Sequence, residues 1–218
     1  MPDLEEAVQI EGYPIVVGID EAGRGPLAGP VVASAVHLKN KNFVSKIRDS
    51  KTLSAKQREA AFVEIFDNAY VGIGIVNESI IDRLNILQAT FHAMQRAVED
   101  LVAHLPVEVR EQTSFSKSMC LLIDGNLFKT DLPYAYKTIV SGDKEVLSIS
   151  CASIVAKVTR DRILNIYDRI FPQYGFKENK GYPTVRHKEA IKLHGLSEIH
   201  RQSFNGLGSS GPKPSLNR

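Results

Sequence analysis

The chain has 218 residues, a mass of 24.1 kDa and a formal net charge of +2, with 43% apolar and 24% charged residues. This composition is typical of a globular protein, and the length suits one domain of generous size. Two cysteines without a Cys-x-x-Cys pair argue against a disulfide framework or a thiolate zinc site, and no apolar run approaches the roughly 20 residues of a bilayer span, so we expect no membrane segment and a cytoplasmic location.

In the N-terminal half, the residue pattern predicts three strands and three helices. The predicted strands are 15–19, 30–38 and 70–76. They are apolar runs with strand character, and the first two are close enough in sequence to pair antiparallel. The predicted helices are 54–69, 78–85 and 86–105. Ser54 suits an N-cap, and the third helix has strong helical periodicity and stops before Pro106.

The C-terminal half continues the alternation of strands and helices. The predicted elements are strands at 119–123 and 134–140, a long helix from 143 to about 170, and a helix at 185–193. A glycine- and lysine-rich loop precedes the last helix, and the Gly, Ser and Pro content of 205–218 is typical of a flexible tail. We therefore expect an α/β fold with a mixed sheet in one domain, 1–204, of which 172–204 is a helical, substrate-binding part.

Charge is unevenly distributed along the chain. Residues 177–218 carry eight Lys or Arg against three acids, whereas the rest carries 19 against 22. A basic C-terminal part beside an acidic remainder suggests one face for a polyanion and another for a metal ion. The alternative is that these charged side chains are simply solvated on the surface and bind nothing.

Two adjacent acids, Asp20 and Glu21, follow the first predicted strand and precede a glycine-rich loop. Neighbouring carboxylates at the end of a buried strand repel one another and resist desolvation unless a cation or a proton resolves the conflict, and a hard divalent metal would do so. The alternatives are solvated loop acids or a phosphate-binding loop. The second is disfavoured because glycines 23, 25 and 29 miss the dinucleotide fingerprint by one residue and two acids would oppose a pyrophosphate.

Asp124 ends another buried strand, so it should converge with Asp20 and Glu21 where open sheets place their ligands. Asp143 and Asp161 compete to be a fourth ligand. On one continuous helix they would lie about 27 Å apart, so only one can belong to the site.

Asp143 is preferred because it follows a glycine turn beside the sheet end. Asp161 lies between Arg160 and Arg162 and is interpreted as a helical ion-pairing residue.

The sequence resembles the ribonuclease HII family, the prokaryotic type 2 ribonucleases H. The matching motifs are GIDEAGRGPLAGPVVASAV at 18–36, RDSKTLS at 48–54, NILQAT at 85–90, LLIDGN at 121–126, SGDKEVLSISCASIVAKVTRDR at 141–162, KGYPT at 180–184 and HRQSF at 200–204. They occur in order over nearly the whole chain, which a chance pair of acids does not explain.

The resemblance implies a ribonuclease H-like fold with a mixed five-stranded sheet, flanking helices and a C-terminal helical extension. It implies endonucleolytic cleavage of the RNA strand of RNA–DNA hybrids and cutting 5′ to ribonucleotides embedded in duplex DNA, with 3′-hydroxyl and 5′-phosphate products. The metal-binding catalytic acids then become Asp20, Glu21, Asp124 and Asp143, which agrees with the choice made from the residues. Carboxylates suit Mg²⁺ or Mn²⁺, and two such ions about 4 Å apart can activate water and relieve the leaving oxygen of charge.

The same resemblance implies roles for residues that touch the substrate. Gly23, Arg24 and Gly25 match the type 2 pattern, where ribonuclease HIII typically has lysine in the middle, and this loop is the implied reader of the 2′-hydroxyl. Tyr182 matches the tyrosine that packs on the sugar after the cleaved ribonucleotide. The lysines in matched motifs are candidate phosphate contacts or solvated side chains, namely Lys51, Lys157 and Lys180.

Other functions and partners are judged from the same residues. A DNA-directed nuclease of the same superfamily would differ in not needing a 2′-hydroxyl, and a non-catalytic nucleic-acid-binding module would have no reason to gather acids beside a polyanion. His187, His194 and His200 are interpreted as surface or substrate-side groups, not as metal ligands. We expect a monomer, and the tail 205–218 has no aromatic anchor for a replication clamp.

Overall fold

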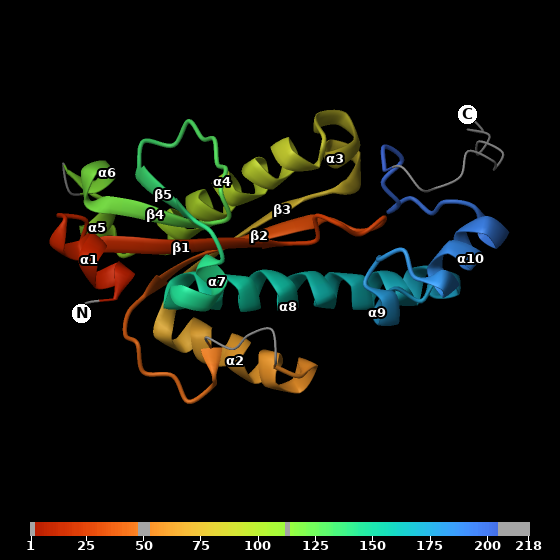
Figure 1. The fold of residues 1–218 in the computed structure, drawn as a ribbon, viewed down its shortest axis with the longest axis horizontal. Coiled ribbons are helices and arrows are strands. Elements are labelled where there is room, and N and C mark those ends of the chain that lie inside the picture. Colours follow the sequence, from red (N-terminus) through yellow and green to blue (C-terminus); the bar gives the residue numbers. More distant parts are fainter. Residues whose placement is uncertain (1–2, 48–52, 112–113, 205–218) are drawn as a thin grey trace.

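The computed structural model of the chain describes residues 3–47, 53–111 and 114–204. Figure 1 shows the arrangement of its elements. In chain order they are α1 (Leu4–Ile10), β1 (Ile15–Ala22), β2 (Val31–Leu38), α2 (Ala55–Asn68), β3 (Ala69–Val76), α3 (Glu78–Leu84), α4 (Ile86–His104), α5 (Val107–Arg110), α6 (Phe115–Ser118), β4 (Met119–Asp124), β5 (Ala135–Ile139), α7 (Gly142–Glu145), α8 (Leu147–Ile170), the 3-10 helix η2 (Pro172–Tyr174), α9 (Phe176–Asn179) and α10 (Val185–His194).

The five strands form one mixed sheet in the order β3-β2-β1-β4-β5. The pairs β1–β2 and β2–β3 are antiparallel, whereas β4 runs parallel to β1 and β5 runs parallel to β4. The predicted α/β class, the five-stranded mixed sheet and the antiparallel pairing of the first two strands are thereby confirmed. Ile19 pairs with Ile123, so the acid that follows each of them lies at the same end of two neighbouring strands.

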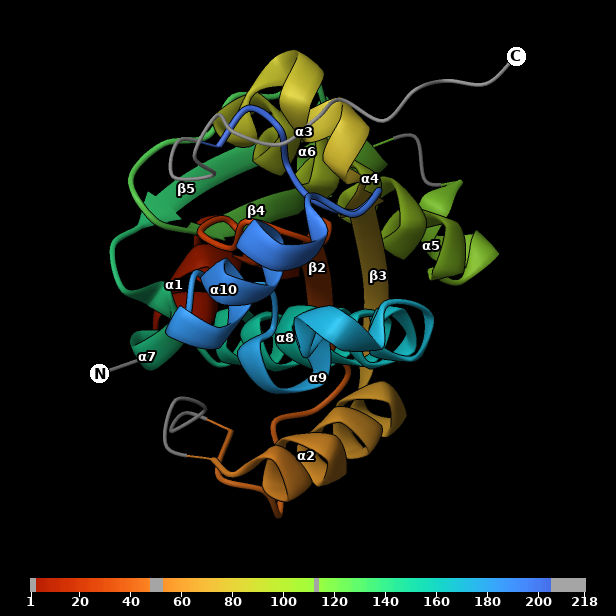
Figure 2. The same cartoon turned by 90° about the vertical axis from the view of Figure 1, so that its right-hand side faces the viewer.

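Helices cover both faces of the sheet (Figure 2). The long helix α8 packs on β1 and β2 from one side, and α4 packs on β2 and β3 from the other. Alternate residues of β1 point to opposite faces of the sheet. Val17 and Ile19 pack in the apolar cluster around α4, and Val16 packs in the cluster that includes Ile149 of α8. A central strand buried on both faces reads as a nearly continuous apolar run, which is the pattern that predicted β1 and β4.

Gly18 allows α8 to approach β1 closely. A Cβ atom at Gly18 would lie 2.3 Å from the backbone nitrogen of Ile149 and 2.3 Å from the carbonyl carbon of Ser148. No side chain larger than a hydrogen atom fits against the backbone of another element at this distance. The first turn of α8 is therefore held directly over β1, two residues before Asp20.

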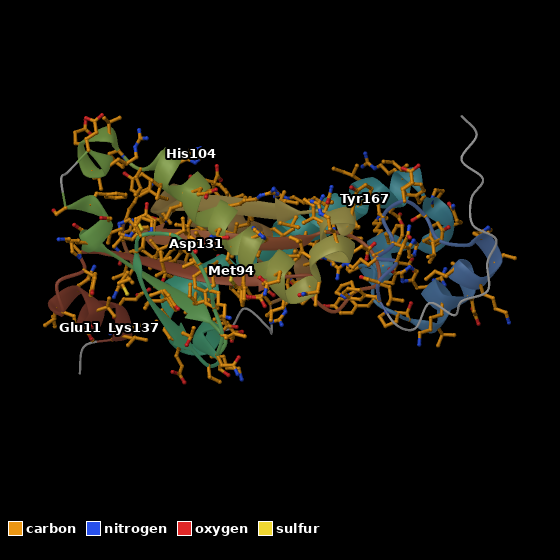
Figure 3. The ribbon with its side chains drawn as sticks, turned by 90° about the horizontal axis from the view of Figure 1, so that it is seen from above. Glu11, Met94, His104, Asp131, Lys137 and Tyr167 are labelled. Atoms are coloured by element: carbon orange, nitrogen blue, oxygen red, sulfur yellow. The ribbon has the colours of Figure 1, made fainter. Side chains whose placement is uncertain are left out.

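The helix α1 lies in a stretch for which the sequence analysis predicted no element. A capping box starts it, because the Asp3 carboxylate accepts from the backbone N–H of Glu6 while the Glu6 carboxylate accepts from that of Asp3. The buried Glu5 accepts a 2.8 Å hydrogen bond from the backbone N–H of Ser148 and so caps α8. Figure 3 shows Glu11 beside Lys137, whose ammonium lies 2.6 Å from the carboxylate and joins the end of α1 to β5.

The predicted long helix from 143 to 170 is wrong at its start. Ser141 has a left-handed φ of 58°, α7 covers only Gly142–Glu145, and Val146 has the extended angles φ −110° and ψ 121° before α8 begins. Asp143 and Asp161 therefore do not share one helix, and the distance calculated for a continuous helix does not apply. Other stretches expected as loops also contain short helices, namely α5, α6, η2 and α9.

The C-terminal elements pack against the far end of α8, away from α1 (Figure 1). A separate apolar cluster holds them there, and its buried members are Ala28, Leu164, Tyr174, Phe176 and Ile199. Ala28 belongs to the connection between β1 and β2, so this cluster also fixes the C-terminal part against the segment that follows the first acids. Among the described residues, no helix is long and apolar enough to cross a bilayer.

Replacing Gly18 with alanine should destabilise the protein, because the added methyl group meets the backbone of α8 and neither element can move freely. We expect a loss of about 1–3 kcal/mol, which is a fall in Tm of roughly 2–4 °C for each kcal/mol in a chain of this size. Gly25→Ala is the matched control, since the same added atom there meets only Tyr182 at an ordinary 3.6 Å. Equal Tm values for the two variants in thermal unfolding would contradict the close approach.

Candidate active site

Acids from three different elements lie at one edge of the sheet. Asp20 belongs to β1 and Asp124 to β4, and the parallel register of these strands sets them side by side. Both positions are even-numbered and share the strand face of Val16, which is the face covered by α8. The backbone N–H of Asp143 in α7 lies 3.4 Å from a carboxylate oxygen of Asp124, at the long limit of a hydrogen bond. Asp20 and Asp124 are thus neighbours and the backbone of Asp143 adjoins them, while the ligand roles of these acids stay predictions.

The Asp20 carboxyl group is nearly inaccessible, with 6% of the residue exposed. One of its oxygens accepts a 2.7 Å hydrogen bond from the backbone N–H of Glu21. Burial raises the pKa of Asp20 well above its usual range, and the negative charges of Glu21 and Asp124 raise it further, against the opposing effect of a hydrogen bond from Ser153. This position therefore carries a negative charge only at an energetic cost.

Glu21 is turned to the other side of the strand from Asp20 by the alternation of β1. Burial raises the pKa of its carboxyl group, and the charge of Asp124 adds to this effect. Arg24 acts in the opposite direction, because its guanidinium lies 3.1 Å from the Glu21 carboxylate. The Arg24 side chain is itself about half exposed, at 51%, so it remains available to a ligand at the surface.

These carboxylates suit a divalent cation by their chemistry. Within the described residues, no three His, Cys, Asp or Glu side chains are already grouped closely enough to hold a metal ion. The set nevertheless consists of oxygen donors alone, which hard cations prefer, and the raised pKa values of Asp20 and Glu21 come from burial and mutual repulsion that a bound cation would relieve. We conclude that the donors fit a hard divalent cation.

The glycine loop, defined here as residues 23–30, follows the acids directly. Gly23 has a φ of +96°, and a Cβ atom there would lie 2.1 Å from Nε of Arg160. A glycine is needed at this position for the backbone conformation and for the arginine, whatever the substrate needs. Gly25 has no such constraint, is exposed, and lies beside the ring of Tyr182.

Arg160, which the sequence analysis treated as a partner of Asp161, is buried and serves the backbone. Its guanidinium donates to the carbonyl oxygens of Pro30, Ala28 and Lys180 at 3.0, 2.9 and 2.9 Å. Arg162 pairs with Glu59 of α2. The charge of Asp161 acts on Arg160, but the hydrogen bonds of the Arg160 guanidinium go to backbone carbonyl groups.

The lysines and Tyr182 occupy different parts of this edge. Lys157 lies on the same face of α8 as Ser153 and Arg160, four and three residues away, and therefore faces the acids and the glycine loop. The Lys180 ammonium donates to the side-chain oxygen of Asn165 at 2.9 Å. Tyr182 is 49% exposed and adjoins Gly25.

Lys51 lies outside the described residues, and its predicted phosphate contact stays a prediction.

His187 and His200 are buried, so of the two alternatives, surface or substrate-side groups, the first is wrong for them, whereas His194 is exposed. Nδ1 of His187 lies 2.8 Å from the carbonyl oxygen of Tyr182, an oxygen that can only accept, so this nitrogen carries the proton. Nε2 of His187 must then accept from Nε2 of His200, 3.0 Å away, and Nδ1 of His200 accepts from the backbone N–H of Ser197. Both rings are neutral in this chain of hydrogen bonds, which fixes the backbone of Tyr182.

Burial lowers the pKa of both histidines, and that of His200 falls to about 4 with the added repulsion of His187. The sequence does not predict the contact between the two histidines, because His187 and His200 are 13 residues apart and on different segments.

The mixed five-stranded sheet with flanking helices is the fold of solved ribonuclease HII and HIII structures. Two solved structures share the fold. One is the ribonuclease HII chain of the PCNA:RNase HII complex from Archaeoglobus fulgidus, with a TM-score of 0.68 and 20% identity over 90% of this chain and 98% of that chain. The other is Bst-RNase HIII in complex with Mn²⁺, with a TM-score of 0.69 and 17% identity over 94% of this chain and 71% of that chain.

Residues 17–206 match the family model described as Ribonuclease HII. Ribonuclease HII of Acholeplasma laidlawii (strain PG-8A) is 44% identical over 202 residues, which cover 92% of each chain. The chain therefore belongs to the ribonuclease HII family, whose members are metal-dependent endoribonucleases, and the resemblance found in the motifs is confirmed. The structures extend the agreement to the fold.

Acid should destabilise the protein through the histidine pair. The unfolded chain binds a proton at a histidine near pH 6.5, whereas His200 in the folded state does so only near pH 4. Between these values the unfolded state holds more protons, so the free energy of unfolding should fall as the pH falls, by up to about 1.4 kcal/mol per pH unit for one proton. His200→Gln should flatten this slope in denaturant titrations at several pH values. His194→Gln, at an exposed position, should leave it unchanged, and an unchanged slope in His200→Gln would contradict the assignment.

Proposed function

We propose that this protein is an endonuclease that hydrolyses the RNA strand of RNA–DNA hybrids and cuts 5′ to ribonucleotides embedded in duplex DNA. The products are a 3′-hydroxyl and a 5′-phosphate. The observation that carries the proposal is the pairing of Asp20 and Asp124 on neighbouring strands at one sheet edge, with the backbone of Asp143 against Asp124 and a glycine loop and an exposed tyrosine close by. Membership of the ribonuclease HII family supports it.

Asp20, Glu21, Asp124 and Asp143 are the residues that would hold two Mg²⁺ or Mn²⁺ ions. When bound, divalent ions supply a water of lowered pKa and neutralise charge at the leaving oxygen. The chain prepares the carboxylates for this task, because β1 and β4 hold Asp20 and Asp124 in neighbouring positions before any ligand arrives. Ser153 and the backbone N–H of Glu21 orient the Asp20 carboxylate, so its position does not depend on the cation alone.

The glycine loop and Tyr182 are the proposed readers of the ribonucleotide. The 2′-hydroxyl is a donor and an acceptor, and it is the sugar group that distinguishes RNA from DNA at one position. Gly25 is exposed and has no side chain, so backbone groups there can approach a sugar closely. The Tyr182 ring stands beside it and can pack on the next sugar, where a deoxyribose leaves more room.

Phosphate contacts would come from exposed or partly exposed cations around the same edge. Arg24 is half exposed beside Glu21, and Lys157 lies on the α8 face that carries Ser153. Lys180 is placed at the start of the turn that carries Tyr182, although its ammonium also bonds Asn165. Such contacts position a nucleic acid without reading its sequence.

The C-terminal elements from residue 172 to 204 are proposed to form the substrate-binding part of a single domain, 1–204, because they bring Tyr182 and a basic stretch to the glycine loop. Their packing on the connection after β1 supports this role. The related Archaeoglobus fulgidus chain was solved in a complex with PCNA. For the present chain we propose no clamp contact through residues 205–218, which lack an aromatic anchor, and the monomeric state and cytoplasmic location stay predictions.

Asp124→Asn should lower cleavage by orders of magnitude, because it removes a charged ligand from the centre of the acidic edge, and it should leave binding of the hybrid intact or tighter since one negative charge near phosphate is lost. The measurement is cleavage with Mg²⁺ of a DNA duplex containing one ribonucleotide and of a continuous RNA–DNA hybrid, with cut positions mapped. Asp143→Asn should behave alike.

Asp161→Asn is the control and should keep wild-type turnover. Full activity of Asp124→Asn would contradict the assignment of Asp124 as a metal ligand. Cleavage of an all-DNA duplex at a similar rate by the wild type would instead indicate a DNA-directed nuclease.

Tyr182→Ala should reduce cleavage of the single-ribonucleotide duplex about tenfold or more, a loss equivalent to about 1.4 kcal/mol, and should affect the continuous hybrid less. The loss follows from removing the ring that stands beside Gly25. Tyr182→Phe keeps the ring and should stay near the wild-type rate. Wild-type rates of Tyr182→Ala on both substrates would require withdrawal of the junction-sensing role, while the carboxylate chemistry would stand.

A further inference from the structure

Of the motif HRQSF at 200–204, only His200 has a role in the site as described so far. In the structure its members contact several different elements. His200 pairs with His187 of α10, and the backbone N–H groups of Gln202 and Ser203 both donate to the carboxylate of Asp82 in α3, at 2.9 Å each. Arg201, between them, is fully buried and is among the largest buried side chains of the described residues.

The Arg201 guanidinium holds the inner side of the glycine loop. It donates to the carbonyl oxygen of Gly23 at 2.6 Å through Nη2 and to that of Arg24 at 3.0 Å through Nη1. It also donates to the carbonyl oxygen of Gly29, at 2.9 Å through Nε and 2.7 Å through Nη2. One side chain from the end of the described chain thus fixes both ends of a loop that lies more than 170 residues earlier.

Arginine is suited to this position in a way that lysine is not. Its planar guanidinium offers five N–H donors in a fixed geometry, whereas an ammonium is a compact point charge that cannot span three separated carbonyl groups. Burying a cation is costly, and the nearby cation Arg160 adds repulsion. Glu78, buried in the same region, attracts both arginines. The positive charge of Arg201 is therefore buried at an energetic cost, and the hydrogen bonds that it makes hold the backbone of the glycine loop.

The segment around Arg201 is anchored independently of that contact. The backbone N–H of Arg201 donates to the carbonyl oxygen of Leu27, and the N–H of Gly29 donates to that of Ile199. The ring of Phe204 lies 4.9 Å from the guanidinium carbon. These contacts hold the guanidinium still, so the loop carbonyls have a fixed partner.

We propose that Arg201 is a positioning residue for ribonucleotide recognition. It draws the carbonyl groups of Gly23 and Arg24 inward and thereby presents the outer side of the loop, with Gly25, to the sugar of the ribonucleotide. This inference rests on the proposed function, in which the glycine loop reads the 2′-hydroxyl. Arg201 acts through the loop and does not touch the reacting atoms.

The experiment compares Arg201→Lys with Asp82→Asn. The Asp82 variant weakens the docking of the same segment, since Asp82 also accepts a 2.6 Å bond from the Ser203 hydroxyl, but it touches no atom of the glycine loop. For each variant we would measure Tm, and then kcat and KM on the single-ribonucleotide duplex well below the Tm. A second readout is the ratio of Kd values for an all-DNA duplex and a ribonucleotide-containing duplex, with Asp124→Asn added to each variant and EDTA present.

Arg201→Lys should lower kcat/KM about tenfold or more and bring the Kd ratio close to one, whereas Asp82→Asn should lower Tm and keep both the ratio and the turnover. A wild-type ratio and rate in Arg201→Lys would overturn the proposal. A loss in both variants that follows their loss of Tm would also overturn it, because the role of Arg201 would then be structural only.

Phe204→Leu provides a second test if Arg201→Lys does not fold. It removes the ring against the guanidinium and keeps the arginine, so the Kd ratio should fall severalfold, and an unchanged ratio would count against the proposal. Failure of the proposed function is distinguishable from failure of this inference. If the wild type shows no preference for the ribonucleotide-containing duplex, the proposed function fails, whereas a wild-type preference that survives in Arg201→Lys removes only the role of Arg201.

Discussion

The parallel pairing of β1 with β4 is the constraint on which the site depends. It places Asp20 and Asp124 at the same end of two adjacent buried strands, where burial and repulsion raise the pKa of Asp20. Such an arrangement opposes folding, and it persists because both faces of the central strands are packed against helices. A bound divalent cation would relieve the repulsion among the acids, so under the proposed function the destabilising feature and the functional feature are the same one.

The helix α8 connects this edge to the rest of the molecule. Its first turn lies over Gly18 and is capped by Glu5, its middle reaches Asp20 through Ser153, and its third quarter holds the glycine loop through Arg160. These contacts follow one another along a single rigid element, so the positions of the acids and of the loop are set together.

Buried charges of opposite sign adjoin the glycine loop, acids in the chain just before it and arginines packed against it. The acids lie before it, while Arg160 and Arg201 lie beneath it and bond almost entirely to backbone carbonyl groups. The backbone N–H groups of Leu27 and Gly29 are also bonded within the protein, so it is the exposed Gly25 that this part of the chain leaves open to a ligand. The histidine pair has a parallel role for the neighbouring turn, since His187 bonds the carbonyl of Tyr182.

The sequence by itself determined the strands, the α/β class and the position of acids at the ends of two buried strands, because a buried strand is an apolar run and a charged residue marks its end. The functional roles of those acids stay predictions. The tertiary structure alone decided where the helix begins after Asp143, since nothing in the residues 142–147 forbids a continuous helix and Val146 is extended only in its packed surroundings. It also decided that Arg160, Arg201 and the two histidines are buried. Their partners are backbone carbonyls or rings from distant segments, and such contacts leave no period or spacing in a sequence. The capping box of α1, by contrast, is a pattern that residues 3–6 do contain. The helix was not predicted from it because seven residues are too few to show a clear helical period.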